Sequence, residues 1–175
     1  ANYETTVQGR GYGLYNYNGH WIAVINLMGR VYMNPLESPF HAFDRIYESI
    51  KEVADIIFVD FHAEATSEKI AFGYYVDGRA TAMVGTHTHV QTADNRILPN
   101  GTAYITDVGM TGPLNGVIGV NKDAVISKFL NALPVRFQPV EEGVGQLSAV
   151  VISIDSSTKT AQSIERIHLI DPFEA

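Results

Sequence analysis

Strand-length apolar runs alternate with helical patterns in the first half of this chain, and this order limits the possible folds more than any other feature. The runs at 21–28 ("WIAVINLM"), 55–61 ("DIIFVDF") and 80–85 ("ATAMVG") predict strands. Two helices are predicted between these runs, one at residues 39–53 and one that begins at Thr66 and ends before Gly78. Strands that alternate with helices form a parallel sheet with helices on its faces. We therefore predict an α/β fold.

Local signals mark where the two helices begin. Ser38 can cap the helix at 39–53, and Pro39 suits its first position because the first N–H groups of a helix have no partner within it. Thr66 can cap the second helix. The apolar face of the first helix comprises Phe40, Phe43, Tyr47, Ile50 and Ala54. This face predicts that the helix packs against the sheet.

The rest of the chain predicts hairpins and one short helix. Residues 1–20 form an arm or hairpin, and residues 96–105 form a hairpin; both segments contain an Asn-Gly pair that predicts the turn. Asn121 can cap a short helix that Pro134 ends. Residues 145–170 read as two antiparallel strands. These hairpins predict a mixed sheet.

Length and composition exclude several classes of protein. The 175 residues fit a single domain, 1–175, that buries a core without further stabilisers. Cysteine is absent, which excludes disulfides and thiol nucleophiles and suits a reducing cytoplasm. With 12 basic and 19 acidic residues, a net charge of −7 and no basic cluster, we expect no long nucleic acid as a partner. No apolar run approaches the roughly 20 residues of a membrane span, and the first residues lack a signal-peptide pattern. We expect a cytoplasmic protein without a membrane partner.

Histidines follow two of the predicted strands. His62 comes after the run at 55–61, and His87 and His89 come after the run at 80–85. Residues two apart in an extended segment point to the same side, so His87 and His89 could aim both imidazoles at one point. Ligand sites in parallel sheets gather at the carboxyl ends of the strands. If the two strands end level, three neutral imidazoles could bind zinc, iron or manganese.

The spacing of these histidines does not by itself establish a metal site, because a single His-x-His pair on a loop more often has no metal-binding role. Asp60 could cap the next helix or orient an imidazole, and we expect it to orient the ring of a metal ligand. Glu64 and Glu68 suit a helix start, and Asp94 and Asp107 suit turns. We expect surface or packing roles for the remaining histidines, which are His20, His41 and His168.

Longer motifs give a more specific indication. The stretches "DFHAEATSEK" (60–69), "GTHTHVQTAD" (85–94) and "GVNKDAVISKFLNALPVRF" (119–137) closely resemble the YmdB family of metallophosphoesterases, bacterial phosphodiesterases associated with 2',3'-cyclic nucleotides. The resemblance extends over nearly the whole chain. It implies a metallophosphoesterase-type α/β sandwich and a site of two divalent metal ions, with iron or manganese expected. By position, His62 and His87 would ligate one ion and His89 the other.

The resemblance also implies residues that this sequence does not contain. Family members open with a portion that carries an Asp in G-D-x-x-G, a bridging Glu in G-E-N and an Asn-His pair in G-N-H, and none of these motifs occurs here. We therefore expect the chain to form the carboxyl-terminal two-thirds of a calcineurin-like metallophosphoesterase domain, with the family's proton donor outside it. Electrostatics agrees, because two divalent ions repel each other and three neutral imidazoles cannot supply the anionic bridge between them. Apolar sheet faces left uncovered would favour a homo-oligomer.

The motifs and the resemblance predict a metal-dependent phosphodiesterase that hydrolyses small cyclic nucleotides such as 2',3'-cyclic AMP. An acidic protein can bind such a substrate because metal ions, rather than lysines, neutralise its single phosphate. This chain would carry the histidine half of the site. Two alternatives stay open: a mononuclear three-histidine metallohydrolase with water as the fourth ligand, and a non-catalytic regulatory domain that binds a nucleotide.

Overall fold

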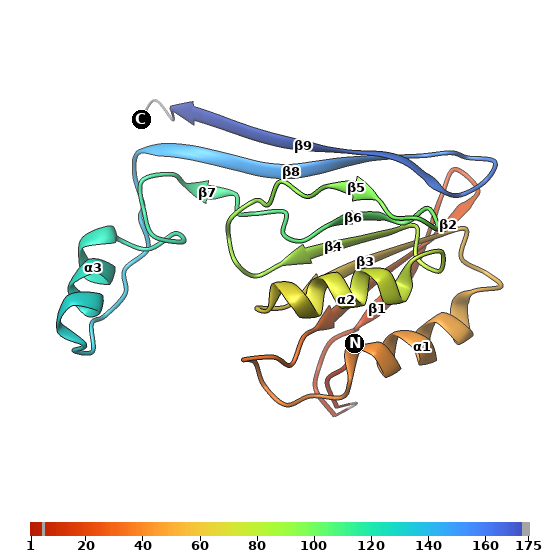
Figure 1. The fold of residues 1–175 in the computed structure, drawn as a ribbon, viewed down its shortest axis with the longest axis horizontal. Coiled ribbons are helices and arrows are strands. Elements are labelled where there is room, and N and C mark those ends of the chain that lie inside the picture. The colour runs from red at the N-terminus through yellow and green to blue at the C-terminus, as the bar shows by residue number, and fades with distance from the viewer. Residues whose placement is uncertain (5, 173–175) are drawn as a thin grey trace.

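The computed structural model describes residues 1–4 and 6–172, and helices and strands alternate in it as the sequence predicts (Figure 1). The strands are β1 (Tyr12–Tyr17), β2 (His20–Met28), β3 (Ile56–His62), β4 (Ala82–Thr86), β5 (Arg96–Ile97), β6 (Ala103–Ile105), β7 (Gly112–Pro113), β8 (Val144–Ile154) and β9 (Ala161–Pro172). The helices are α1 (Pro39–Ile50), α2 (Thr66–Val76) and α3 (Lys122–Asn131). None of the described helices is long and apolar enough to cross a membrane.

Six strands form the main sheet, in the order β1-β2-β3-β4-β6-β5. Strands β2, β3, β4 and β6 are parallel. The edge strands β1 and β5 pair antiparallel with β2 and β6, because each belongs to a hairpin with a short turn. The α/β class and the mixed sheet are therefore confirmed.

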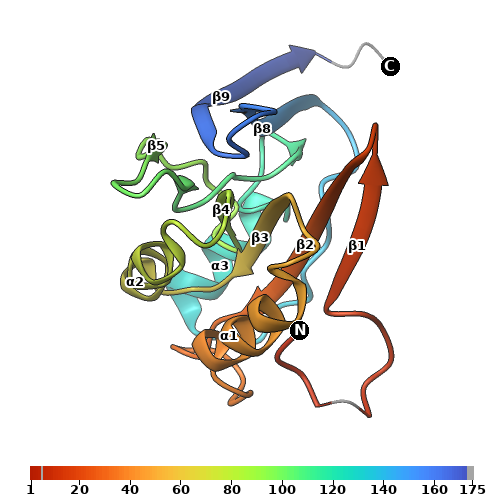
Figure 2. The ribbon, with the colours of Figure 1, turned by 90° about the vertical axis from the view of Figure 1, so that its right-hand side faces the viewer.

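Helices α1 and α2 cover one face of the main sheet (Figure 2). Alternate residues of the strands point into this layer, and Val59 and Phe61 of β3 are fully buried there. The ring of Phe72 from α2 stacks on Phe61 with centroids 4.4 Å apart and meets Phe43 of α1 edge to face at 5.9 Å. Each buried side chain of this kind stabilises the fold by about 1.5–3 kcal/mol. The contacts hold both helices against the strands that carry the candidate site.

A second sheet, β7-β8-β9, covers part of the opposite face. Strands β8 and β9 form one long antiparallel hairpin, as predicted for residues 145–170. The core between the two sheets contains Val84 and Ile105 from the main sheet and Ile164 from β9. The three layers are therefore helices, main sheet and second sheet, in that order (Figure 2).

The helix ends differ from the predictions in several places, and Ser38, the N-cap of α1, makes no side-chain capping hydrogen bond. Helix α1 ends at Ile50 instead of residue 53, because residues 51–53 form a turn that leads the chain into β3. Helix α2 has Ala65 as its N-cap and Thr66 as its first helical residue, so the prediction that Thr66 caps this helix is wrong. Asn121 caps α3 as predicted, with a side-chain oxygen that accepts hydrogen bonds from two backbone N–H groups.

Candidate metal centre

Two adjacent strands bring predicted ligands to one edge of the main sheet. Strand β3 ends at His62, and β4 ends at Thr86, directly before His87. In this parallel pair His62 lies opposite Thr86, so the two strands end level. The carboxyl ends of parallel strands are the usual place for a ligand site. The sequence predicted a shared site for these histidines only if the two strands end level, and they do.

His62 and His87 are in direct contact. Nδ1 of His87 lies 2.9 Å from Nε2 of His62, and the rings meet edge to face with centroids 4.7 Å apart. Both side chains are partly buried. Imidazole nitrogens bind a metal ion at about 2.0–2.1 Å, so two nitrogens at this separation can share one ion. The structure therefore brings together two of the three histidines that the sequence indicates as ligands.

Thr86 links His62 to Asp60. The Thr86 hydroxyl donates to Oδ1 of Asp60 at 2.9 Å, and its oxygen lies 3.1 Å from Nδ1 of His62. Because the threonine proton is directed to Asp60, the oxygen accepts from Nδ1–H of His62, which leaves Nε2 with the lone pair that binds a metal. Asn26 donates to the other Asp60 oxygen at 2.9 Å and holds the carboxylate. Asp60 thus acts on His62 through Thr86. The sequence did not indicate Thr86 as part of the site, although its position at the end of β4 could have suggested it.

Glu64 extends this line of polar groups. Its Oε2 lies 2.8 Å from Nε2 of His87. The sequence indicated Glu64 only as a residue that suits the start of a helix, so this contact was not predicted. A neutral imidazole carries one N–H, so a neutral His87 cannot donate to both His62 and Glu64. Added positive charge beside these groups, such as a metal ion, would fit the arrangement. Glu64 contacts the ring nitrogen of His87 that faces away from His62, so its carboxylate does not converge with the two histidines on one point.

The surroundings of His62 favour its neutral form. Burial lowers the pKa of His62 below its ordinary value, and the neighbouring His87 lowers it further. Asp60 raises the pKa of His62 but does not cancel these effects. A neutral imidazole at pH 7 is the protonation state that binds a metal.

His89 does not join the other two histidines. The backbone φ is 119° at His87 and 66° at His89, so the segment bends and the expectation of an extended segment is wrong. Nδ1 of His89 lies 3.2 Å from the backbone oxygen of Ile118. Within residues 1–4 and 6–172, no group of three or more His, Asp and Glu side chains is placed to hold a metal ion. The role of His89 as a ligand stays a prediction.

A buried ion pair holds this bend. Nζ of Lys69 lies 2.8 Å from Oδ2 of Asp107, with side chains that are 0% and 1% exposed. The same oxygen accepts from the backbone N–H of Thr88 at 2.9 Å, and Oδ1 accepts from that of Gly109 at 2.9 Å. Burial raises the pKa of Asp107, but these hydrogen bonds outweigh it and the pKa is lowered overall. Asp107, which the sequence suggested only as a turn residue, therefore positions the residue between the two histidines.

The other candidates lie outside the histidine pair. Asp94 accepts hydrogen bonds from the hydroxyls of two nearby threonines. Nδ1 of His20 lies 2.7 Å from Nζ of Lys159. His41 is exposed on α1, and His168 lies on β9 with Nδ1 3.3 Å from a serine hydroxyl of β8. These contacts agree with surface or packing roles for His20 and His41.

Comparison with known proteins shows the family of this chain. The family described as YmdB-like protein matches residues 1–167. The chain belongs to the YmdB family. The 2',3'-cyclic-nucleotide 2'-phosphodiesterase of Bacillus subtilis is 55% identical over 171 residues, which are 98% of this chain and 64% of that protein. Crystal structures of a hypothetical protein from Thermus thermophilus and of a novel phosphatase from Mycoplasma pneumoniae are both 38% identical, with TM-scores of 0.91 and 0.90.

The YmdB-family match includes the candidate metal centre, because His62, His87 and His89 all lie within residues 1–167. Both crystal structures cover 98% of this chain, and the matched segments are 66% and 62% of those proteins. The chain therefore spans slightly less than two-thirds of the length of these relatives. The resemblance seen in the sequence motifs is confirmed at the level of the family and the fold.

Proposed function

We propose that the intact protein hydrolyses phosphodiesters of small cyclic nucleotides, such as 2',3'-cyclic AMP, with two divalent metal ions. The observation that carries this proposal is the His62–His87 pair, whose facing nitrogens lie 2.9 Å apart beside the Glu64 carboxylate. The name of the Bacillus subtilis relative supports the substrate class. This chain would contribute the histidine half of the site.

The metal ions would be iron or manganese, which accept imidazole and carboxylate ligands. His62 and His87 would hold one ion, and His89 the other. When bound, divalent ions neutralise phosphate oxygens and supply a nucleophilic water at neutral pH.

The surrounding residues keep these donors in place. Through Thr86, Asp60 keeps the proton of His62 on Nδ1, so that Nε2 presents its lone pair. The Lys69–Asp107 pair shapes the bend that carries His87. We assign no proton donor for the leaving oxygen among the residues of this chain.

Metal content and turnover test this proposal on the intact protein. We expect His87→Ala to lose bound iron or manganese and most hydrolysis of 2',3'-cyclic AMP, because one of two adjoining nitrogen ligands is removed. His41→Ala, an exposed change on α1, is the matched control and should keep both. If His87→Ala retains the metal content and the turnover of the unmodified protein, the assignment is wrong.

A mononuclear site is the second candidate. It is favoured by the contact between His62 and His87, because His89 contacts the backbone of Ile118 instead of joining them. It predicts one tightly bound ion per chain, whereas the two-metal proposal predicts incomplete loading of the 175-residue chain by itself. Elemental analysis of the purified chain separates the two.

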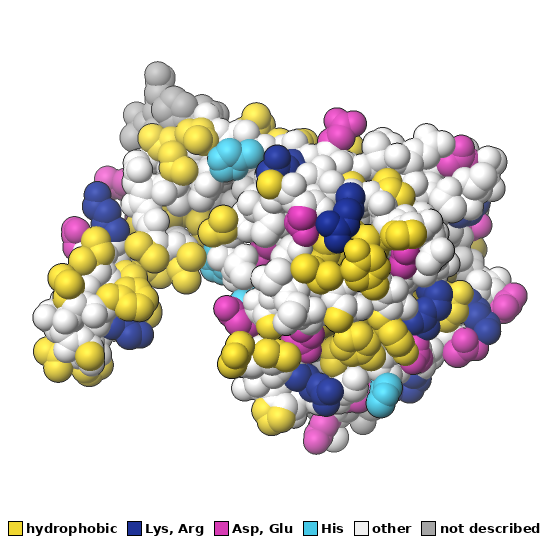
Figure 3. All heavy atoms as spheres, in the orientation of Figure 1, with side chains coloured by type: hydrophobic (Ala, Val, Ile, Leu, Met, Phe, Trp, Pro, Cys, Tyr) yellow, Lys and Arg dark blue, Asp and Glu magenta, His cyan; other side chains and the backbone are white. Residues whose placement is uncertain are grey.

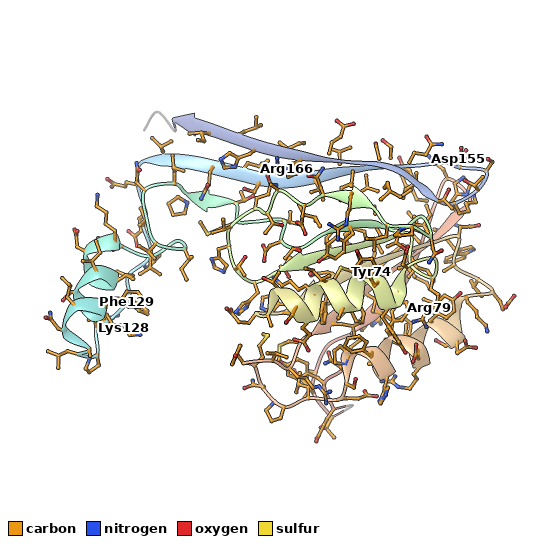
Figure 4. The ribbon with its side chains drawn as sticks, viewed as in Figure 1. Tyr74, Arg79, Lys128, Phe129, Asp155 and Arg166 are labelled. Carbon is orange, nitrogen blue, oxygen red and sulfur yellow. The ribbon has the colours of Figure 1, made fainter. Side chains whose placement is uncertain are left out.

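We also propose that the chain self-associates through α3. This helix stands away from the sheets and presents apolar side chains, with Phe129 84% and Leu130 78% exposed (Figures 3 and 4). A second copy is the fitting partner because α3 carries Asp123 in its first turn and Lys128 in its last turn, so two antiparallel copies can oppose unlike charges. Sedimentation should show a dimer or larger species that Phe129→Ser converts to monomer. A monomer before substitution would contradict this proposal.

A further inference from the structure

The inner face of the β8–β9 hairpin changes character along its length. Val150, Ile152 and Ile164 point toward the main sheet and pack in the core between the sheets. Farther along the same face, Arg166 lies opposite Val150, and His168 lies opposite Ser148. Figure 4 labels Arg166 partway along the hairpin. The inward side chains are therefore apolar over the sheet and polar at Arg166, His168, Ser148 and Gln146, and an exposed isoleucine, Ile170, follows on the same face.

The outer face shows the reverse pattern at this end of the hairpin. Leu147 and Leu169, which lie opposite each other and point outward, are 41% and 59% exposed. A strand that covers a core usually directs apolar residues inward and polar residues outward. Here the inward positions carry polar side chains although apolar residues are available on the same strands. The polar part of the inner face therefore fits a polar ligand better than a hydrocarbon partner.

These polar side chains line an open cavity of about 640 Å³. Its polar lining consists of His89, Gln91, Gln146, Ser148, Arg166 and His168. None of the described residues in the lining is acidic, although the chain as a whole carries a net charge of −7. The volume lies in the range of small-molecule sites, roughly 300–1,000 Å³. The cavity therefore suits a small anionic ligand.

Hydrogen bonds hold the lining in place, and Arg166 keeps further donors for a ligand. Nε2 of Gln91 lies 3.1 Å from the backbone oxygen of Val108 and 3.0 Å from that of Ala149. The second contact connects the segment that carries the histidines to β8. Arg166 donates one Nη1 proton to the backbone oxygen of Thr92 at 3.4 Å, and a guanidinium has five N–H donors. Arginine binds phosphate strongly because two of its N–H groups match two phosphate oxygens.

We propose that this cavity binds a second phosphate group of the substrate, beside the phosphodiester that is hydrolysed, with Arg166 and His168 as its ligands. The proposal rests on the function proposed above, because His89 belongs both to the cavity lining and to the candidate metal ligands. Metal ions would bind the reactive phosphate, so an arginine in the adjoining cavity serves a different anionic group. The substrate class that fits is a 2',3'-cyclic nucleotide with a phosphate on its 5' oxygen.

The test compares two substrates on the intact, metal-loaded protein: adenosine 2',3'-cyclic phosphate with and without a 5'-phosphate. We expect the 5'-phosphate to raise kcat/KM about tenfold or more, as a charge-assisted pair allows. Arg166→Gln should abolish this preference, so that the variant hydrolyses the two substrates with equal kcat/KM. Arg136→Gln, a change of another exposed arginine outside the cavity, should keep the preference.

The possible failures of the two proposals are distinguishable. Equal kcat/KM for the two substrates, or a preference that survives Arg166→Gln, overturns the phosphate cavity while hydrolysis itself stands. If neither substrate is hydrolysed, the proposed function fails, and calorimetric titration of both compounds then decides the cavity alone. Tighter binding of the 5'-phosphorylated compound that is lost in Arg166→Gln supports the cavity, and equal binding overturns it.

Discussion

Replacing Lys69 with methionine tests whether a buried charge supports the histidine bend. Lys69 and Asp107 are 0% and 1% exposed, and their charged atoms lie 2.8 Å apart. Methionine fills similar space but leaves the Asp107 carboxylate buried without its cation. Breaking a buried pair by removing one partner costs about 3–5 kcal/mol. Typical domains are stable by about 5–15 kcal/mol, so this loss is a large share of the total.

The dependence of this loss on pH follows from the pKa of Asp107. The hydrogen bonds from Lys69 and from two backbone N–H groups hold the pKa of Asp107 below its ordinary value despite burial. Its stabilisation is therefore complete above the ordinary carboxyl pKa of about 4 and is lost as the pH falls through the lowered value. Without Lys69 the Asp107 carboxyl protonates more readily. The difference in the free energy of unfolding between Lys69→Met and the unmodified protein should therefore shrink below about pH 4.

Urea unfolding at pH 7 and at a pH below about 4 measures both effects. Lys51→Met is the matched control, because it removes a lysine from the exposed pair with Glu48 and should leave the unfolding midpoint nearly unchanged. Adding Asp107→Asn to Lys69→Met should recover part of the loss by removing the unpaired charge. A loss below about 1 kcal/mol for Lys69→Met at pH 7 would refute the reasoning, since that is the scale of an exposed pair.

Three further changes test other parts of the structure. Gly85→Ala would place a Cβ 1.7 Å from the backbone oxygen of Thr106, so we expect a loss of at least about 1–3 kcal/mol in urea unfolding; an unchanged midpoint would show that the strands separate easily there. Asn121→Ala should destabilise α3 by about 1 kcal/mol, and hydrogen exchange that stays as slow in this helix would argue against the cap. Thr86→Val removes the link from His62 to Asp60 and should weaken Mn²⁺ binding about 10–100-fold in a titration, whereas equal affinity would count against the link.

The sequence predicted the parallel centre of the fold well because the signals there are local. The apolar runs at 21–28, 55–61 and 80–85 became β2, β3 and β4 with small changes at their ends. Buried strands show as continuous apolar runs, and capped amphipathic segments show as helices. The packing of the 145–170 hairpin onto the sheet was not visible, because it depends on contacts between residues far apart in the chain.

The candidate site was predicted less completely. His62 and His87 meet because two parallel strands end level, which strand order and length can suggest. The positive φ angles that turn His89 away depend on the contacts of Asp107, whose lysine partner is 38 residues away. A lysine in a helix reads as a surface residue, so nothing in the local pattern indicates that Lys69 is buried. Tertiary contacts of this kind set the details of the site.

The left-handed backbone at both histidines of the bend has a consequence for how ligands bind. Non-glycine residues rarely adopt such φ angles without support, and here the Asp107 oxygens supply it from the core. The loop is therefore shaped when the chain folds, before any ligand arrives. A pre-organised loop loses little conformational entropy on binding, so affinity for an incoming ion should depend mainly on the donor atoms. Loosening the core beneath the loop would then weaken ion capture even with every donor intact.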